Sequence, residues 1–166
     1  MKMKKEYTGV AARVFDAVSE TIVSAGYDVW DVAFGKRGAD YVLEITIDAP
    51  GGIGIDDCEK VSRAVDPILD ETDPIDSAYL LEVSSPGIER ELSMPRHFDA
   101  CAGKTVSFRL FSPDPVTGCR NFRAAAEGYD AETDCVIAEY EGKRLSLPFR
   151  SISSAKLYYD FDTNKI

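Results

Sequence analysis

The chain has 166 residues and a formal net charge of −10, from 19 basic and 29 acidic side chains. This length suits one ordinary domain or two small ones, and the apolar fraction of 45% is that of a globular protein. Composition therefore excludes the fibrous and disordered classes. A mean negative field repels phosphates, which excludes a whole-surface attraction to nucleic acid or anionic lipid. Any such contact requires a local basic patch or must pass through a basic partner.

The N-terminal segment carries positive charge but lacks the apolar stretch of a secretory signal, because Arg13, Asp16 and Glu20 interrupt every candidate run. No stretch reaches the roughly 18 apolar residues of a membrane span. The four cysteines are widely spaced and form no Cys-x-x-Cys pair, which disfavours a zinc or redox site and suits a reducing compartment. We therefore expect a cytoplasmic protein with no metal, no cofactor and no membrane contact.

The acidic surplus is confined to one part of the chain. Residues 1–100 hold 10 basic and 20 acidic side chains, whereas residues 101–166 hold 9 of each. A composition shift of this kind indicates two domains. The predicted division is an α/β domain over 1–92, a linker with a short helical turn over 93–101 and a second domain over 102–166.

The first predicted element is an amphipathic helix. Val10, Val14, Val18 and Ile22 recur at every fourth position, and Gly26 follows where a helix commonly ends. This spacing places one apolar face against a sheet.

Two strands are predicted next, over 29–34 and 43–48, because apolar and polar residues alternate in both. Each strand is expected to have one polar face, which includes Asp31 in the first. The connecting turn is predicted over 35–40.

The second helix is predicted to begin with Asp56 as N-cap and Glu59 at the third helical position, in the manner of a capping box. Val61 and Val65 then mark its apolar face. Residues 79–83 read as a third strand. The order αββαβ predicts an N-terminal α/β sandwich, with two helices packed on a three-stranded sheet.

The second region consists of short strand candidates separated by turn signals. They lie over 105–111, 123–129, 136–140, 144–147 and 155–159, with a one-turn helix at 148–152. Five short strands in so few residues predict a small SH3-like or Sm-like β-barrel, which closes its own edges. The fold class is therefore α+β.

The segment Gly51-Gly52-Ile53-Gly54 has the GxxG spacing that KH domains use against a nucleic-acid backbone. Asp56 and Asp57 place carboxylates at the following helix start, where they already satisfy the helix dipole. A flexible strand-to-helix turn is therefore favoured over a phosphate site.

The loop from Ser84 to Arg90 is the most informative segment. Pro86 and Gly87 suit the second and third positions of a type II turn, so the preceding strand runs into a rigid loop. Ser84 and Ser85 form no nucleophile elbow, and hydrogen bonding to the turn backbone is their favoured role. Arg90 is the cation best placed for a carboxylate or phosphate, with an ion pair to a neighbouring acid as the alternative.

His97 is the only histidine, so any catalytic relay would have to run through it. Packing or capping is the favoured role, and we predict no enzymatic activity. In the second region cations alternate with strand residues, and Phe111, Phe122 and Tyr140 lie near them in sequence. Basic and aromatic side chains together can bind RNA through backbone contacts and base stacking. A solvated surface over an aromatic core is the alternative, and it explains the pattern equally well. These cations are Lys104, Arg109, Arg120, Arg123, Lys143, Arg144 and Arg150.

The run YLLEVSSPGIERELSMPRHFDACAGKTVSFRL over 79–110 resembles the signature of the bacterial ribosome maturation factor RimP family. Further similarity lies in 42–52, 56–63 and 120–122, and in the closing residues from Ile152 to Leu157. Glu91 stands where family members usually have a proline, which predicts a looser link between the domains and leaves Arg90 unchanged.

The resemblance implies a non-catalytic two-domain factor, an α/β domain followed by an SH3-like barrel, that assists maturation of the small (30S) ribosomal subunit. It implies binding to immature small subunits near the decoding centre, with the basic twelfth small-subunit protein and nearby ribosomal RNA as partners, and a monomer is expected. A stand-alone RNA-binding module that regulates translation remains the alternative. The expected contact residues are Ser84, Ser85, Pro86, Gly87, Arg90, Arg120, Arg123, Lys143 and Arg144.

Overall fold

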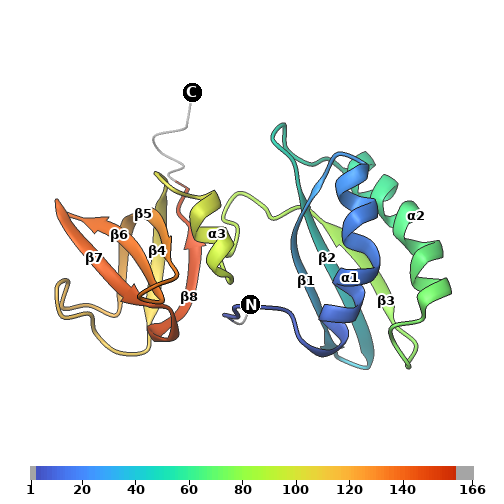
Figure 1. The fold of residues 1–166 in the computed structure, drawn as a ribbon, viewed down its shortest axis with the longest axis horizontal. Coiled ribbons are helices and arrows are strands. Elements are labelled where there is room, and N and C mark those ends of the chain that lie inside the picture. The colour runs from blue at the N-terminus through green and yellow to red at the C-terminus, as the bar shows by residue number, and fades with distance from the viewer. Residues whose placement is uncertain (1–2, 160–166) are drawn as a thin grey trace. The chain divides into compact units, whose positions relative to one another are not determined.

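The structure is a computed structural model that describes residues 3–159 (Figure 1). Within this range the chain has three α-helices and two sheets, which confirms the α+β class. Contacts divide the described residues into two compact units. The N-terminal unit is 6–86, and the C-terminal unit is 87–159 together with 3–5. The predicted domain limits around 93–101 stay a prediction.

The N-terminal unit has two helices on one face of a three-stranded sheet (Figure 1). Its elements are α1 (Gly9–Ser24), β1 (Asp28–Arg37), β2 (Asp40–Asp48), α2 (Ile55–Thr72) and β3 (Leu80–Ser84). The strand order is β1-β2-β3, with β1 antiparallel and β3 parallel to the central β2. The predicted arrangement of two helices and three strands is therefore confirmed.

The core of this unit lies between the sheet and the predicted apolar helix faces. Val14, Val18 and Ile22 of α1 are buried, and so are Leu43 and Ile45 of β2. Full burial of one such side chain contributes about 1.5–3 kcal/mol. The same spacing buries three residues of α2, namely Val61, Val65 and Leu69.

Strand β1 departs from the predicted alternation. The pairing register shifts between Val29 and Asp31, and such a bulge breaks the two-residue period of a strand. Asp31 is consequently buried, at 1% exposure, so the prediction that it lies on a polar face was wrong. The predicted turn over 35–40 was also too long, because the strands stay paired to Arg37 and Asp40.

The C-terminal unit carries a five-stranded antiparallel sheet in the order β7-β6-β5-β4-β8. Its elements are α3 (Pro95–Ala100), β4 (Thr105–Leu110), β5 (Asn121–Asp130), β6 (Cys135–Tyr140), β7 (Lys143–Pro148), a 3-10 turn η1 (Phe149–Ser151) and β8 (Ile152–Leu157). The predicted strand at 155–159 began too late, because Ile152 already pairs with Leu110.

The segment before α3 is part of this unit's core. Leu92, Ser93 and Met94 are buried, and Phe98 of α3 stacks on Phe108 with ring centroids 6.1 Å apart. The backbone N–H of Leu92 donates to Ala155 at 2.9 Å, and that of Leu157 donates to Arg90 at 2.8 Å. Residues 90–92 are thus held against β8, although position 91 is not a proline.

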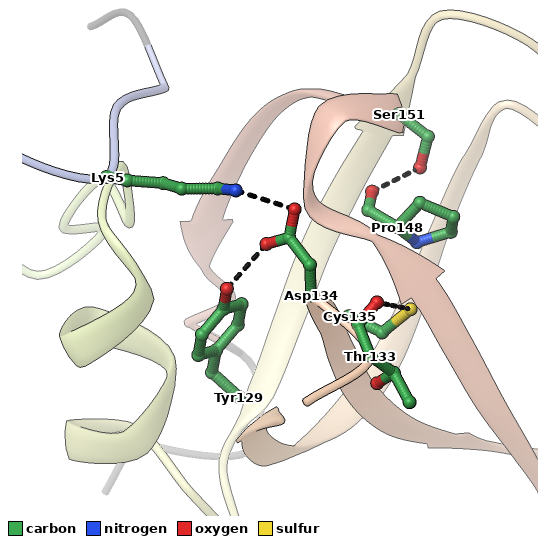
Figure 2. Close-up of polar contacts among 7 residues, drawn as sticks. All are labelled: Lys5, Tyr129, Thr133, Asp134, Cys135, Pro148 and Ser151. Atoms are coloured by element: carbon green, nitrogen blue, oxygen red, sulfur yellow. Dashed lines mark hydrogen bonds and ion pairs between the residues drawn. The ribbon is translucent and has the colours of Figure 1, made fainter. Parts of the chain in front are cut away.

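The first described residues also belong to the C-terminal unit. The N–H of Lys4 donates to the carbonyl of Ser93 at 2.8 Å, and the Lys5 ammonium lies 2.6 Å from Asp134 (Figure 2). The other oxygen of that carboxylate accepts the Tyr129 hydroxyl. Both donors hold the pKa of Asp134 below its ordinary value, with Lys5 as the larger cause. The hydrogen bond to Asp134 in turn raises the pKa of Tyr129 to about 12.

Candidate functional site

In the loop after β3, Gly87 has the positive φ that the sequence predicts, +82°. The turn itself lies one residue further on, at Ile88 and Glu89, so the prediction that Pro86 and Gly87 form its centre was wrong. Ser84 ends β3, where it pairs with Thr46 of β2. Ser85 lies exposed beyond the strand. The loop therefore passes from the N-terminal to the C-terminal unit between Pro86 and Gly87.

Arg90 lies half-buried at the end of this loop. Two acids that were candidates for an ion pair with it have other partners. Glu89 lies 3.8 Å from the Lys156 ammonium, and Asp99 accepts the backbone N–H of Tyr129 at 2.9 Å. Arg90 takes part in an interaction of its own within the structure, and it stays a predicted contact residue.

The GxxG segment leads into a capped helix. Gly54 is the N-cap of α2, and its N–H donates to the Asp57 carboxylate at 2.8 Å. The Tyr27 hydroxyl donates to the other Asp57 oxygen at 2.6 Å, and these two bonds lower the pKa of Asp57. The assignment of Asp56 as N-cap was wrong, because the helix begins at Ile55. The anion at this helix start is the chain's own carboxylate.

Glu59 was expected to complete that capping box, and this was wrong as well. Its carboxylate pairs with Arg63 one turn further along α2. The third helical position, from which a side chain reaches back to the N-cap, is Asp57.

His97 is fully buried in the first turn of α3. Its Nδ1 accepts the backbone N–H groups of Ser93 and Met94, at 2.9 and 3.1 Å. The capping role predicted for this histidine is therefore confirmed. Within residues 3–159 no group of three or more Cys, His, Asp or Glu is arranged to hold a metal ion.

The N-terminal unit has an acidic groove at the C-terminal end of α2. The groove has a volume of about 570 Å³, and its floor includes Tyr79 and Leu81. Burial raises the pKa of Tyr79, and nearby carboxylates raise it further. A helix C-terminus is the negative end of the helix dipole, which adds to the negative potential there. The carboxylates that line the groove are those of Asp66, Asp70, Asp73 and Asp76.

The predicted cations of the C-terminal unit do not form one cluster. Arg144 of β7 pairs with Glu127 at 3.9 Å and stands opposite Glu139, so carboxylates offset its charge. Lys143 precedes it on the same strand, and Arg120 lies exposed just before β5. Arg123 instead places its guanidinium 4.0 Å from the centre of the Tyr158 ring.

Arg123 lies on a groove that crosses β8, β4 and β5, which we call the three-strand groove. It has a volume of about 520 Å³ and also contains Arg109, Lys156 and Glu91. Lys156 was not among the predicted cations, because its place in the groove depends on which strands are neighbours. Strand alternation predicts that the Lys156 side chain points outward, but only the pairing of β8 with β4 places it opposite Ser107 and diagonal to Arg109. The polar residues between the cations are Ser107, Asn121 and Ser154.

The fold and these surfaces define a two-unit α+β protein in which one unit is strongly acidic and the other nearly balanced in charge. The N-terminal unit has 17 acidic and 5 basic side chains, a formal charge of −12. Residues 17–89 match the family model of the RimP N-terminal domain, a range that includes both helices and all three strands of this unit except the start of α1. The match confirms the resemblance to the RimP family of ribosome maturation factors, whose N-terminal domain the chain carries.

Among the described residues no helix is both long and apolar enough to cross a membrane.

Proposed function

We propose that this protein is a non-catalytic, cytoplasmic maturation factor for the small (30S) ribosomal subunit. It binds the immature subunit near the decoding centre, engages a basic small-subunit protein through its N-terminal unit and approaches ribosomal RNA through its C-terminal unit. The observation that carries this proposal is the acidic groove on the very unit that matches the RimP N-terminal domain.

The acidic groove suits a basic protein segment. Four exposed aspartates surround a partly apolar floor, so a lysine or arginine can place its charge among carboxylates while its alkyl stem covers Tyr79. Exposed charges of this kind increase association rates and are screened by salt, which suits a factor that later leaves the subunit.

We further propose that the C-terminal sheet is an SH3-like barrel. The connectivity supports this, because a 3-10 turn precedes the last strand, and that strand returns to pair with the first strand of the sheet. Such small barrels commonly serve as binding platforms. The predicted contact residues Arg120, Arg123, Lys143 and Arg144 all belong to this unit.

Sedimentation tests the proposal. The tagged full chain, centrifuged through a gradient from lysate, should migrate with the small subunit and not with complete ribosomes. The variant Asp66→Asn/Asp70→Asn/Asp73→Asn should associate less with immature subunits. A matched control with three exposed acids removed elsewhere in the same unit, Glu20→Gln/Asp28→Asn/Asp40→Asn, should associate normally. Equal loss in both variants would show that net charge, not the groove, drives binding.

Arg90 is tested separately. Arg90→Ala with an unchanged melting temperature should weaken association with immature subunits. Unchanged sedimentation of this variant would remove Arg90 from the contact surface.

The alternative function, a stand-alone RNA-binding module that regulates translation, predicts a different pattern. Such a module would bind free ribosomal RNA tightly, with a steep salt dependence, and would ignore the basic ribosomal protein. Direct binding measurements with each purified partner distinguish the two.

A further inference from the structure

We propose that the three-strand groove binds the phosphate backbone of single-stranded RNA, with Arg109, Arg123 and Lys156 as the phosphate contacts. The inference deepens the proposed function and rests on it for the identity of the RNA as ribosomal. The chemistry of the groove is argued from the C-terminal unit alone.

Strand pairing fixes the layout of the groove. Ser107 is paired with both Lys156 and Arg123, and Arg109 is paired with Ser154 on one side. The strands lie about 4.8 Å apart and alternate residues about 7 Å apart, so the positions occupy about 10 by 7 Å. The outward residues form two rows: Lys156, Ser107 and Arg123 in one, and Ser154, Arg109 and Asn121 in the other.

The cations of the groove carry a local surplus of positive charge. Within residues 3–159 neither Arg109 nor Arg123 forms an ion pair, and the Lys156 ammonium is 3.8 Å from Glu89 with both side chains about half exposed. An exposed pair of this kind is weak and competes poorly with a phosphate. Glu91 is the one carboxylate that lines the groove. Three cations against Glu91 in the groove and Glu89 beside it leave a net positive charge, which attracts a polyanion although the whole chain is acidic.

The groups around the cations favour a phosphate backbone over an acidic peptide. Hydroxyl and amide donors of serine and asparagine separate the cations, and such groups commonly contact nucleic-acid phosphates and sugars. Arg123 is oriented by its stacking on Tyr158, which leaves the guanidinium edge for a bidentate contact. Phe122 belongs to the core beneath the groove, at 9% exposure, where it packs on Phe108, so the groove offers its contacts to the backbone and not to the bases.

The test measures binding of the full chain to a fluorescent single-stranded RNA oligonucleotide over a range of salt concentrations. The groove variant is Arg109→Gln/Arg123→Gln/Lys156→Gln. Each lost phosphate contact lowers the salt slope of single-strand binding by about 0.7, so three lower it by about 2. That slope corresponds to an affinity loss of about 20-fold between about 50 and 200 mM salt, which the variant should no longer show.

Two further variants keep the result interpretable. Lys36→Gln/Lys60→Gln/Arg63→Gln removes the same charge from the N-terminal unit and should bind RNA as the unmodified chain does. Arg109→Lys/Arg123→Lys keeps the charge and should keep the salt slope, while loss of bidentate geometry weakens binding at every salt concentration. Circular dichroism verifies that each variant is folded.

An unchanged salt slope in the groove variant overturns the proposal, and so does an equal loss in the N-terminal control. If the groove variant loses binding to an acidic protein but still binds RNA, the groove is a protein-binding surface, and this result also overturns the proposal. If the chain sediments with small subunits but binds no oligonucleotide, the groove proposal fails and the proposed function stands. If it binds the oligonucleotide through the groove but never sediments with subunits, the proposed function fails and the groove stands.

Discussion

Gly128 occupies a position in β5 that no other residue fits without cost, and its replacement by alanine tests the packing of α3 on the sheet. Its φ is +140°, and an added Cβ would lie 2.8 Å from the Asp99 Oδ1. That oxygen accepts the Tyr129 N–H at 2.9 Å, so the carboxylate cannot retreat without losing the bond. The neighbouring register shift between Ala126 and Gly128 sets this conformation.

Two costs combine in Gly128→Ala. Backbone strain at a sparsely populated φ costs about 1–3 kcal/mol, and loss of a hydrogen bond to a charged acceptor costs about 1.5–3 kcal/mol. The reduced entropy of the unfolded chain offsets about 0.4–1 kcal/mol. We therefore expect a destabilisation of the C-terminal unit by about 2–4 kcal/mol. Amide hydrogen exchange in β5 and β6 measures it within that unit.

A double-mutant cycle with Asp99→Ala isolates the clash. Without the carboxylate, Gly128→Ala should cost only its backbone strain, so the two substitutions should couple by about 1.5–3 kcal/mol, the cost of the lost hydrogen bond. Gly142→Ala is the matched control, because Gly142 also has a positive φ, +78°, but open space around it. Additive effects of Gly128→Ala and Asp99→Ala, or coupling of equal size with Gly142→Ala, would refute the reasoning.

Two other predictions concern stability and titration. Leu43→Ala leaves a cavity at the centre of the N-terminal sheet and should lower the free energy of unfolding by about 2–5 kcal/mol. Leu80 is 57% exposed, so Leu80→Ala should change this free energy little. Urea unfolding followed by Trp30 fluorescence compares the two variants, and equal effects would contradict the assigned core. Tyr129→Phe should remove a tyrosinate absorbance step near pH 12, because the hydrogen bond to Asp134 favours the phenol form of Tyr129. The stability that this hydrogen bond contributes is complete below pH 10 and is lost as pH rises through about 12. An absorbance step that is unchanged in the variant would count against the hydrogen bond.

The sequence was sufficient to predict elements whose periodicity is regular. The four-residue spacing from Val10 to Ile22 predicted the buried face of α1, and the turn residues divided the second region into its five strands with small errors at the ends. A bulge leaves no trace in such a pattern, which is why Asp31 was placed on the wrong face. A two-residue difference in where α2 begins likewise transferred the capping role from Glu59 to Asp57.

The candidate sites were less predictable because they depend on which strands become neighbours. Local sequence identified Arg123 as an exposed cation on a strand, and nothing local distinguishes it from Arg144. The difference comes from the register, which sets Arg144 opposite Glu139 and brings Arg123, through Ser107, into line with Lys156. The acidic character of residues 1–100 was evident from composition, whereas the gathering of aspartates at the end of α2 needed the fold.

The ion pair between Lys5 and Asp134 joins residues 129 positions apart in the chain. During synthesis at about 5–20 residues per second, Lys5 is made about 6–26 s before its partner. All of residues 6–86, which form the N-terminal unit, are synthesised in that interval. The C-terminal unit therefore finishes last and incorporates residues 3–5, which are synthesised before the whole N-terminal unit, so its completion should be sensitive to whatever binds these residues in the meantime.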